Sequence, residues 1–401
     1  MKQTTKPLAE IAEFRLGKML DDRRNNGEPL PYLANINVRW GEFDLENLRE
    51  MRFEHDEMDR YGLKYGDIVM CEGGEPGRCA IWKESVPGMM IQKAIHRIRP
   101  HDCIDHRFLF YSFLHKGRSG TFAPLFTGAT IKHLPREKLA KVEIAFPSLD
   151  VQRRIADILS AYDDLIENNR RRMALLEDAA RQLYREWFVR LRFPGHEHTR
   201  ITNGVPEGWE RKRIGDVSDC VGGGTPSTSV SNFWEDGDVT WVTPTDVTRN
   251  AHFVLLDSDK RITGAGLQNS SAKLVPPHAV LMTSRASVGF FAIAGREVCT
   301  NQGFISIVPH ESILWPYFLF HLSERVEEIR AMGSGSTYPE VSRGKFREFV
   351  VLLPKHALVV AFCEQVTVFF KQIRFLKQQS EKLRAGRNLL LPRLMSGEIS
   401  A

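Results

Sequence analysis

The chain has 401 residues, of which 42% are hydrophobic and 26% charged, a composition that suits a folded protein of two or three domains. Its net charge is only +5, with 8 basic and 3 acidic residues in 354–401 but 15 basic and 18 acidic ones in 193–353. A protein that holds nucleic acid by charge alone is usually more basic, so DNA binding by this chain would need the help of a partner.

The first globule is expected to span residues 1–146. Its pattern predicts short elements separated by Gly- and Pro-containing turns, as in a mixed domain. The expected elements are a short helix or strand in 8–20, a strand at 32–38 that ends before Gly41, a hairpin in 65–82, a single strand in 89–100 and a helix at 108–117.

Residues 147–192 predict one long helix. After Pro147 and the capping Ser148, no Gly or Pro interrupts the chain until Pro194. Roughly forty residues at about 1.5 Å each give a rod of about 60 Å. Every third or fourth residue forms one narrow stripe, which indicates half of a coiled coil. The stripe contains Ile155, Leu159, Tyr162, Ile166, Asn169, Met173, Leu176, Ala180, Leu183 and Trp187.

A linker, 194–209, and a second globule complete the segment 193–353. In the linker His196 and His198 flank Glu197, and a solvated linker is the better interpretation than a metal site because no third ligand follows at a useful spacing. The second globule repeats the order of elements of the first with little identity. Residues 210–227, 238–250, 278–294, 299–309 and 315–333 correspond to 8–20, 31–41, 71–82, 89–100 and 108–117.

The segment 354–401 predicts a second long helix that repeats the first. Aligning Pro147 with Pro354 gives a shift of 207 positions and brings the stripes into phase. The second stripe contains Phe362, Val366, Phe369, Ile373, Leu376, Leu383 and Leu390. If the helices pair antiparallel, Asn169 and Leu376 lie near the midpoints and face each other. A buried Asn169 would fix the register, whereas a solvated polar gap is the alternative.

Motifs of catalysis are missing from the sequence. The Gly-rich stretches 73–77 and 222–224 have neither a GK[ST] ending nor a GxGxxG pattern, so we interpret them as turns. We find no amino-methyltransferase motif, no nuclease carboxylates with a lysine, and no nucleophile elbow. Six scattered cysteines form no CxxC pair, and no apolar run or signal pattern indicates a membrane. These features predict a cytoplasmic protein with no catalytic or metal site.

Several stretches together resemble the DNA-specificity (S) subunits of type I restriction–modification enzymes. They are 146–189 with WFVRLRFPG and VPEGW, then GGGTPS, WVTPTDV and the terminal LLLPRLMSGEIS. The resemblance covers essentially the whole chain. It implies an α+β fold in which two repeated target-recognition domains are joined by two long antiparallel coiled-coil helices. The implied boundaries are 1–146, 147–192, 193–353 and 354–401.

The same resemblance implies a function without catalysis. Each target-recognition domain would read one half of a bipartite double-stranded DNA sequence, and the helices would set the gap. Two modification subunits, which use S-adenosylmethionine, and two restriction subunits, which use ATP and Mg²⁺, would dock on this chain. The chain itself would carry no cofactor.

Base-reading candidates are polar residues at strand ends and turns, where side chains can donate to or accept from base edges. In the first globule they are Asn35, Asn37, Arg39, Arg78, Lys93, Thr130 and Lys132. In the second they are Thr245, Asp246, Arg249, Ser284, Arg285, Asn301, Gln302 and Ser336.

Two other functions remain open from the sequence. A helical scaffold or adaptor would use its globules to bind proteins, and the acidic second globule favours that alternative. A recognition subunit of a related restriction system would have a fused nuclease–methylase partner.

Overall fold

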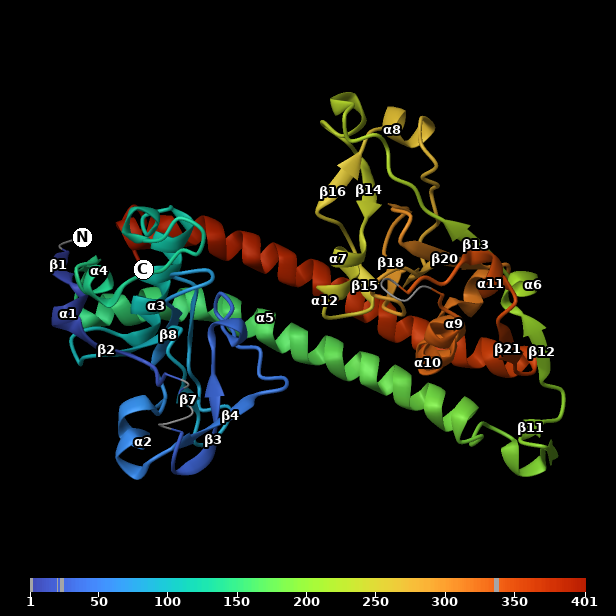
Figure 1. Cartoon of the computed structure of the whole chain (residues 1–401), viewed down its shortest axis with the longest axis horizontal. Coiled ribbons are helices and arrows are strands. Elements are labelled where there is room, and N and C mark those ends of the chain that lie inside the picture. The colour runs from blue at the N-terminus through green and yellow to red at the C-terminus, as the bar shows by residue number, and fades with distance from the viewer. Residues whose placement is uncertain (1–2, 20, 22–24, 335–338) are drawn as a thin grey trace. The chain divides into compact units, whose positions relative to one another are not determined.

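The computed structural model describes residues 3–19, 21, 25–334 and 339–401 (Figure 1). The chain divides into two compact units, Met1–Ile166 with Lys382–Ala401, and Glu167–Glu381. Two long helices, α5 (Leu149–Tyr184) and α12 (His356–Ser396), each contribute one part to each unit. Every other described helix and strand lies within a single unit.

The first unit contains sheets in the orders β2-β8-β5-β6, β4-β3-β7 and β1-β9, and among its described strands the β3–β7 pair is the parallel one. The strands are β1 (Thr4–Pro7), β2 (Ala12–Leu16), β3 (Glu28–Leu33), β4 (Arg49–Phe53), β5 (Ile68–Cys71), β6 (Cys79–Ile81), β7 (Met90–Ile91), β8 (Ile95–Pro100) and β9 (Glu143–Phe146). The short helices are α1 (Leu8–Ile11), α2 (His55–Tyr61), α3 (His106–Arg118) and α4 (Arg136–Ala140).

The second unit contains sheets in the orders β13-β20-β17-β18-β15, β16-β14-β19, β12-β21 and β10-β11. The strands are β10 (Ile201–Thr202), β11 (Val205–Pro206), β12 (Glu210–Arg213), β13 (Ser218–Gly222), β14 (Val239–Val242), β15 (Val254–Leu255), β16 (Lys260–Ile262), β17 (Val280–Thr283), β18 (Phe291–Ala294), β19 (Cys299–Thr300), β20 (Phe304–Pro309) and β21 (Val350–Leu353). The short helices are α6 (Ile214–Val217), α7 (Pro244–Thr248), α8 (Gly264–Gln268), α9 (Trp315–Glu324), α10 (Val326–Ala331) and α11 (Arg343–Arg347).

The internal repeat predicted from the sequence is confirmed strand by strand. The order β2-β8-β5-β6 recurs as β13-β20-β17-β18, β4-β3-β7 recurs as β16-β14-β19, and β1-β9 recurs as β12-β21. Equivalent backbone hydrogen bonds, one within each unit, fix how the sequences of the two repeats align. Gly66 N donates to Trp82 O over 3.0 Å, and His278 N donates to Ala294 O over 2.8 Å at the matching turn. Strand β15 is an addition of the second unit.

Two predicted strands of the first globule need correction. The strand expected at 32–38 ends earlier, because β3 stops at Leu33 and a one-turn 3₁₀ helix, η2 (Asn35–Asn37), follows. The single strand expected in 89–100 is two strands of different sheets. Ile95 N donates to Gln92 O over 3.2 Å, so a turn separates β7 from β8.

In the first unit, α5 and α12 pack antiparallel, on α5 through the predicted stripe. On α12 the predicted Leu383 and Leu390 are only partly buried, and Leu391 and Leu394 are the fully buried residues. Ile155 and Leu159 are fully buried and share a core cluster with Leu391 of α12. A salt bridge between Asp163 and Arg387 lies further along the pair. Apolar burial therefore joins these helix parts to the globule core, in the way that a coiled-coil stripe predicts.

In the second unit the same two helices also pack antiparallel. Tyr184 near the end of α5 contacts Phe362 near the start of α12, with ring centroids 6.0 Å apart. Helix α5 then widens into a π-helical turn, η4 (Arg185–Val189), which leaves the consecutive residues Trp187 and Phe188 both buried. The expected regular helix to residue 192 therefore ends earlier, because two aromatic rings in succession pack into one core.

The polar position of the stripe is buried rather than solvated. Asn169 is 4% exposed, and its Nδ2 donates to Ser380 Oγ over 3.3 Å and to Gln379 Oε1 over 3.1 Å. The repeat alignment predicted Leu376 as the residue opposite Asn169. The observed partners, Gln379 and Ser380, lie about one helical turn beyond it. Side-chain hydrogen bonding accounts for the difference, because a buried amide needs a polar partner and Leu376 offers none in its side chain.

Candidate nucleic-acid interface

In each unit, loops that follow the strand ends gather at one edge. The first loop edge consists of residues 34–39, 71–78, 92–94 and 127–133, and the second loop edge consists of residues 243–249, 284–290, 301–303, 334 and 339–341. Backbone hydrogen bonds hold the loops together. Glu72 N donates to Ala94 O over 2.9 Å, and Ser284 N donates to Gly303 O over 2.8 Å at the matching place. Both edges therefore have the same backbone frame.

Two predicted base readers stabilise this frame with their side chains. Asn37 Oδ1 accepts the backbone N–H of Ala34 over 3.0 Å, and Asp246 Oδ2 accepts that of Thr243 over 2.7 Å. Asn37 and Asp246 occupy equivalent places, the third residue of a one-turn helix after β3 and β14. A side chain in the first helical turn that accepts the N–H of the N-cap residue satisfies one of the free donors at the helix start. These side chains are consequently engaged inside the protein.

Arg78 also bonds within the first loop edge. Its side chain is 14% exposed, its Nη2 donates to Asn35 O over 2.9 Å, and its Nη1 pairs with Glu75 over 2.7 Å. Asn35 Nδ2 lies 3.4 Å from Gly73 O. Below these groups, burial raises the pKa of the Cys71 thiol. The Arg78 guanidinium thus ties the 71–78 hairpin to the loop after β3.

At one matched place the two edges carry different chemistry. A backbone bridge joins Gly73 to His133 in the first unit and Arg285 to Glu340 in the second. Arg285 Nε lies 3.6 Å from Glu340 Oε2, and both side chains are about half exposed, at 53% and 48%. A surface pair of this kind contributes at most about 1 kcal/mol, so a ligand can replace it at little cost.

The candidates with exposed side chains divide between the two edges. Residues of the first are Lys93, Thr130 and Lys132, and those of the second are Thr245, Arg249, Arg285 and Gln302. Arg39 is half exposed, and its guanidinium lies near Asp44 and the carbonyls of its own loop. Among the described residues, the ion pair of Arg249 is with Asp259 at 4.0 Å. The exposed side chains of Lys93, Lys132 and Arg249 can therefore meet a negatively charged ligand, whereas Arg39 and Arg285 would exchange an existing contact for it.

The remaining candidates are less available. Ser284 is buried, and Asn301 Oδ1 accepts the backbone N–H of Gly303 over 2.9 Å. Ser336 lies outside the described residues. Base reading by any of these candidates stays a prediction.

One residue of the second loop edge and one residue that bonds to it escaped the sequence reasoning. Glu340 faces Arg285, and Thr225 Oγ1 donates to Gln302 Oε1 over 2.6 Å. Thr225 belongs to the GGGTPS motif, which carried part of the family resemblance and could have directed attention to its hydroxyl. For Glu340 the signal was weaker, since it requires alignment with His133 across the repeat.

Over the described ranges, no cluster of three or more His, Cys, Asp or Glu side chains could hold a metal ion. No helix in the same part of the chain is both long and apolar enough to cross a membrane.

Comparison with known proteins gives a family. The model of the type I restriction modification DNA specificity domain matches residues 2–178 and again residues 206–385. The MjaIX specificity subunit of a type I restriction enzyme from Methanocaldococcus jannaschii is 30% identical over 181 residues, which are 45% of this chain and 42% of that protein. That match spans less than half of the relative's length.

A second relative and a solved structure match more of the chain. The HindI specificity subunit of Haemophilus influenzae is 22% identical over 352 residues, covering 72% of this chain and 74% of that one. The crystal structure of the S subunit of a type I restriction–modification system from M. genitalium covers 98% of this chain and 96% of its own, with a TM-score of 0.59 and 16% identity. That likeness shows the fold. The two matched segments include both repeats and most of the chain, which therefore belongs to the type I restriction modification DNA specificity domain family.

Proposed function

We propose that this chain is the DNA-specificity subunit of a type I restriction–modification complex. Each unit reads one half of a bipartite double-stranded DNA site with its loop edge. The observation that carries this proposal is the pair of loop edges, in which one backbone frame holds different exposed side chains. Two readers of different half-sites need that combination of a constant frame and variable contacts.

Arg285 is the strongest base-reading candidate. A guanidinium can donate two hydrogen bonds to O6 and N7 of guanine, the commonest specific contact in the major groove. Glu340 beside it can accept from N4 of cytosine. In the first unit, where Gly73 and His133 stand at these places, Lys132 and Thr130 of the neighbouring loop supply the exposed polar groups. The two half-sites should therefore differ.

The outer faces of the long helices suit the docking of partner subunits. In the second unit, Val368 and Phe375 lie seven residues apart on one face of α12 and are 51% and 65% exposed, and Leu175 of α5 is 69% exposed. Large apolar side chains left in solvent on a helix favour a protein partner. We assign these faces to two modification subunits, with two restriction subunits completing the complex.

In this proposal the chain has no active site and no cofactor of its own. S-adenosylmethionine belongs to the modification subunits, and ATP and Mg²⁺ belong to the restriction subunits. The modest net charge of +5 agrees with a chain whose partners supply further positive surface around the DNA. The complex acts on DNA in the cytoplasm.

The test is a reconstituted complex in which Arg285 is changed to Ala. We expect affinity for the cognate site to fall by about 1–3 kcal/mol, with one base position relaxed in the half-site read by the second unit. Methylation patterns mapped by single-molecule sequencing would show this change. Arg211→Ala is the matched control, because Arg211 is exposed on β12 and lies outside the second loop edge.

Other outcomes are informative. Equal loss of affinity for all sequences, with a smaller salt dependence, would assign Arg285 to a phosphate. An unchanged site and unchanged affinity would remove Arg285 from the interface. Methylation by the purified chain alone, with S-adenosylmethionine but no partner subunit, would contradict the non-catalytic role.

A further inference from the structure

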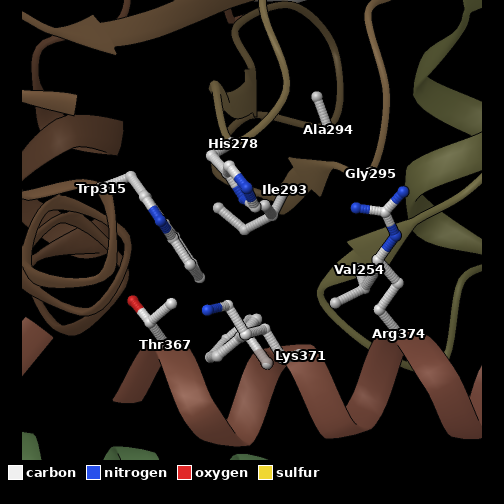
Figure 2. A pocket seen from close by; sticks show the side chains of 10 residues that line it. Val254, His278, Ile293, Ala294, Gly295, Trp315, Thr367, Lys371 and Arg374 are labelled. Atoms are coloured by element: carbon white, nitrogen blue, oxygen red, sulfur yellow. The ribbon is translucent and has the colours of Figure 1, made fainter. Parts of the chain in front are cut away.

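A cavity of about 90 Å³ lies in the second unit between α12 and the edge of the five-stranded sheet. It is separate from the second loop edge. Its lining residues come from α12, from the start of α9 and from three strand regions (Figure 2). They are Val254, His278, Ile293, Ala294, Gly295, Trp315, Thr367, Phe370, Lys371 and Arg374.

One wall of the cavity is aromatic and rigid. The Trp315 ring stacks on that of His278, with centroids 5.3 Å apart and planes 13° from parallel, and it meets Phe370 edge-on at 4.9 Å. Trp315 is 3% exposed. Ring contacts of this kind hold side chains in fixed positions. The wall is therefore formed before any ligand arrives.

His278 occupies a backbone conformation that favours glycine. Its φ is +70°, and the equivalent turn of the first unit has Gly66 with φ +86°. A side chain in the left-handed region costs free energy, although His tolerates it better than most residues do. The second unit thus has an imidazole on a strained backbone at the turn where the first unit has a glycine. That imidazole lines the cavity.

Two cations stand at the mouth. Lys371 and Arg374 rise from α12 toward the sheet edge in Figure 2. Within the described ranges neither has an acidic partner or a side-chain hydrogen bond. Burial is the main cause that lowers the pKa of His278, and the positive charges of Arg374 and Lys371 lower it further. The ring is therefore neutral at neutral pH. Like charges one helical turn apart repel, and an anion between them would relieve the repulsion.

In the first unit an exposed ion pair occupies the equivalent place. Helix position Asp164 corresponds to Lys371, and strand-end position Lys83 corresponds to Gly295, by the alignment of the repeat. Lys83 Nζ lies 3.8 Å from Asp164 Oδ1. In the second unit the sheet-side cation is replaced by a glycine, and the helix-side carboxylate is replaced by an unpaired ammonium. An exposed surface ion pair of the first unit thus corresponds, in the second unit, to cations that have no acidic partner among the described residues.

We propose that this cavity binds a compact hydrophobic carboxylate, whose single ring or branched alkyl group enters the aromatic slot and whose carboxylate lies between Lys371 and Arg374. Apolar cavities somewhat larger than this one hold a benzene ring, and the open mouth provides the additional room. Charge-assisted bonds to carboxylates are the strong class of hydrogen bond. The site is independent of DNA recognition, because the lining residues lie outside the loops of the second loop edge.

Benzoate is the probe, tested by isothermal titration on the full chain, with thermal unfolding as a second measurement. A ligand of this size should bind in the millimolar range or somewhat tighter. Benzyl alcohol and benzylamine have the same ring without the anion, and each should bind at least about 10-fold more weakly. Benzoate should also raise the unfolding temperature, because a ligand that binds only the folded state stabilises it.

Variants separate the two parts of the proposal. Changing both Lys371 and Arg374 to Met should weaken benzoate about 10-fold or more and abolish its advantage over benzyl alcohol. Thr367→Phe should fill the slot and weaken both ligands. Lys382→Met, an exposed cation on the same helix outside the lining, should leave binding unchanged. Absence of benzoate binding at millimolar concentration, equal binding of benzyl alcohol, or full binding by the double variant would each overturn the proposal.

Discussion

Replacement of Asn169 by Leu should separate stability from register in the helix pair of the second unit. The Asn169 amide donates to Gln379 Oε1 and Ser380 Oγ, while Ser380 Oγ donates to Leu376 O of its own helix over 2.9 Å. The Ser380 hydroxyl keeps a hydrogen bond within its own helix when Asn169 is replaced. The buried Asn169 amide, in contrast, depends on the residues of α12 for its hydrogen bonds. Gln379 is exposed and can turn to water when the amide is gone.

The expected change in stability follows from these contacts. Leu loses two neutral hydrogen bonds, at about 1 kcal/mol each. It gains about 1.5–3 kcal/mol from burial of its side chain in a position that is 4% exposed. The net free energy of unfolding should thus stay level or rise by about 1 kcal/mol. Asn169→Ala loses the same bonds, about 2 kcal/mol, without that gain, so it should lower the unfolding temperature by about 4–8 °C.

Register is measured separately, by the distance distribution between spin labels at Leu175 and Phe375. Both positions are exposed on the helices of the second unit. The background needs Cys103→Ser, because Cys103 is the exposed cysteine and the others are buried. We expect a broader distribution in the Leu variant than in the parent. A Leu variant that is as unstable as the Ala variant, or that keeps the parent's distribution, would refute the reasoning.

Burial lowers the pKa of His321 to about 3, against about 6.5 in the unfolded chain, so its stabilising effect is full above pH 6.5 and declines as the pH falls toward 3. Between pH 7 and pH 5 the parent should lose about 2 kcal/mol more than His321→Gln in denaturant titrations. Glu177 accepts the backbone N–H of Phe253 over 2.6 Å, so Glu177→Gln should speed amide exchange at Phe253 by about 10-fold, whereas Glu364→Gln on the exposed face of α12 should not. Exchange of residues 203–353 for the equivalent segment of a relative should change one half of the methylated sequence and leave the other, and a change in both halves would show that the units are not independent readers. Insertion of one heptad into each long helix should lengthen the gap by about three base pairs with both half-sites retained, because a heptad adds about 10 Å.

The long helices could be predicted because their stripe depends on little more than apolarity and spacing. Ile155, Leu159 and Val366 need only to recur at steps of three and four residues to become buried. The strand after residue 28 was harder. Its end at Leu33 depends on the Asn37 side chain, which bonds to Ala34 and to Asp44 O and folds the chain into a turn. The alternation of apolar and polar residues, from which a strand is predicted, contains no information on such a side-chain bond.

The candidate interface was only partly predictable for a related reason. Residue type and position select polar residues at turns as candidates. Whether such a side chain can bind a ligand depends on whether it already makes hydrogen bonds within the protein, as that of Arg78 does, or is exposed, as that of Lys132 is. The internal repeat contains some of that missing information. Where both units place a side chain of the same shape whose oxygen accepts the equivalent backbone N–H, as with Asn37 and Asp246, the residue holds the common frame. Where the frame is kept but the residue changes class, as from Gly73 to Arg285, the side chain is not needed for the frame, and we propose that it specifies a base. In that proposal, alignment of the two halves of this chain separates frame residues from base-reading residues more sharply than residue type does.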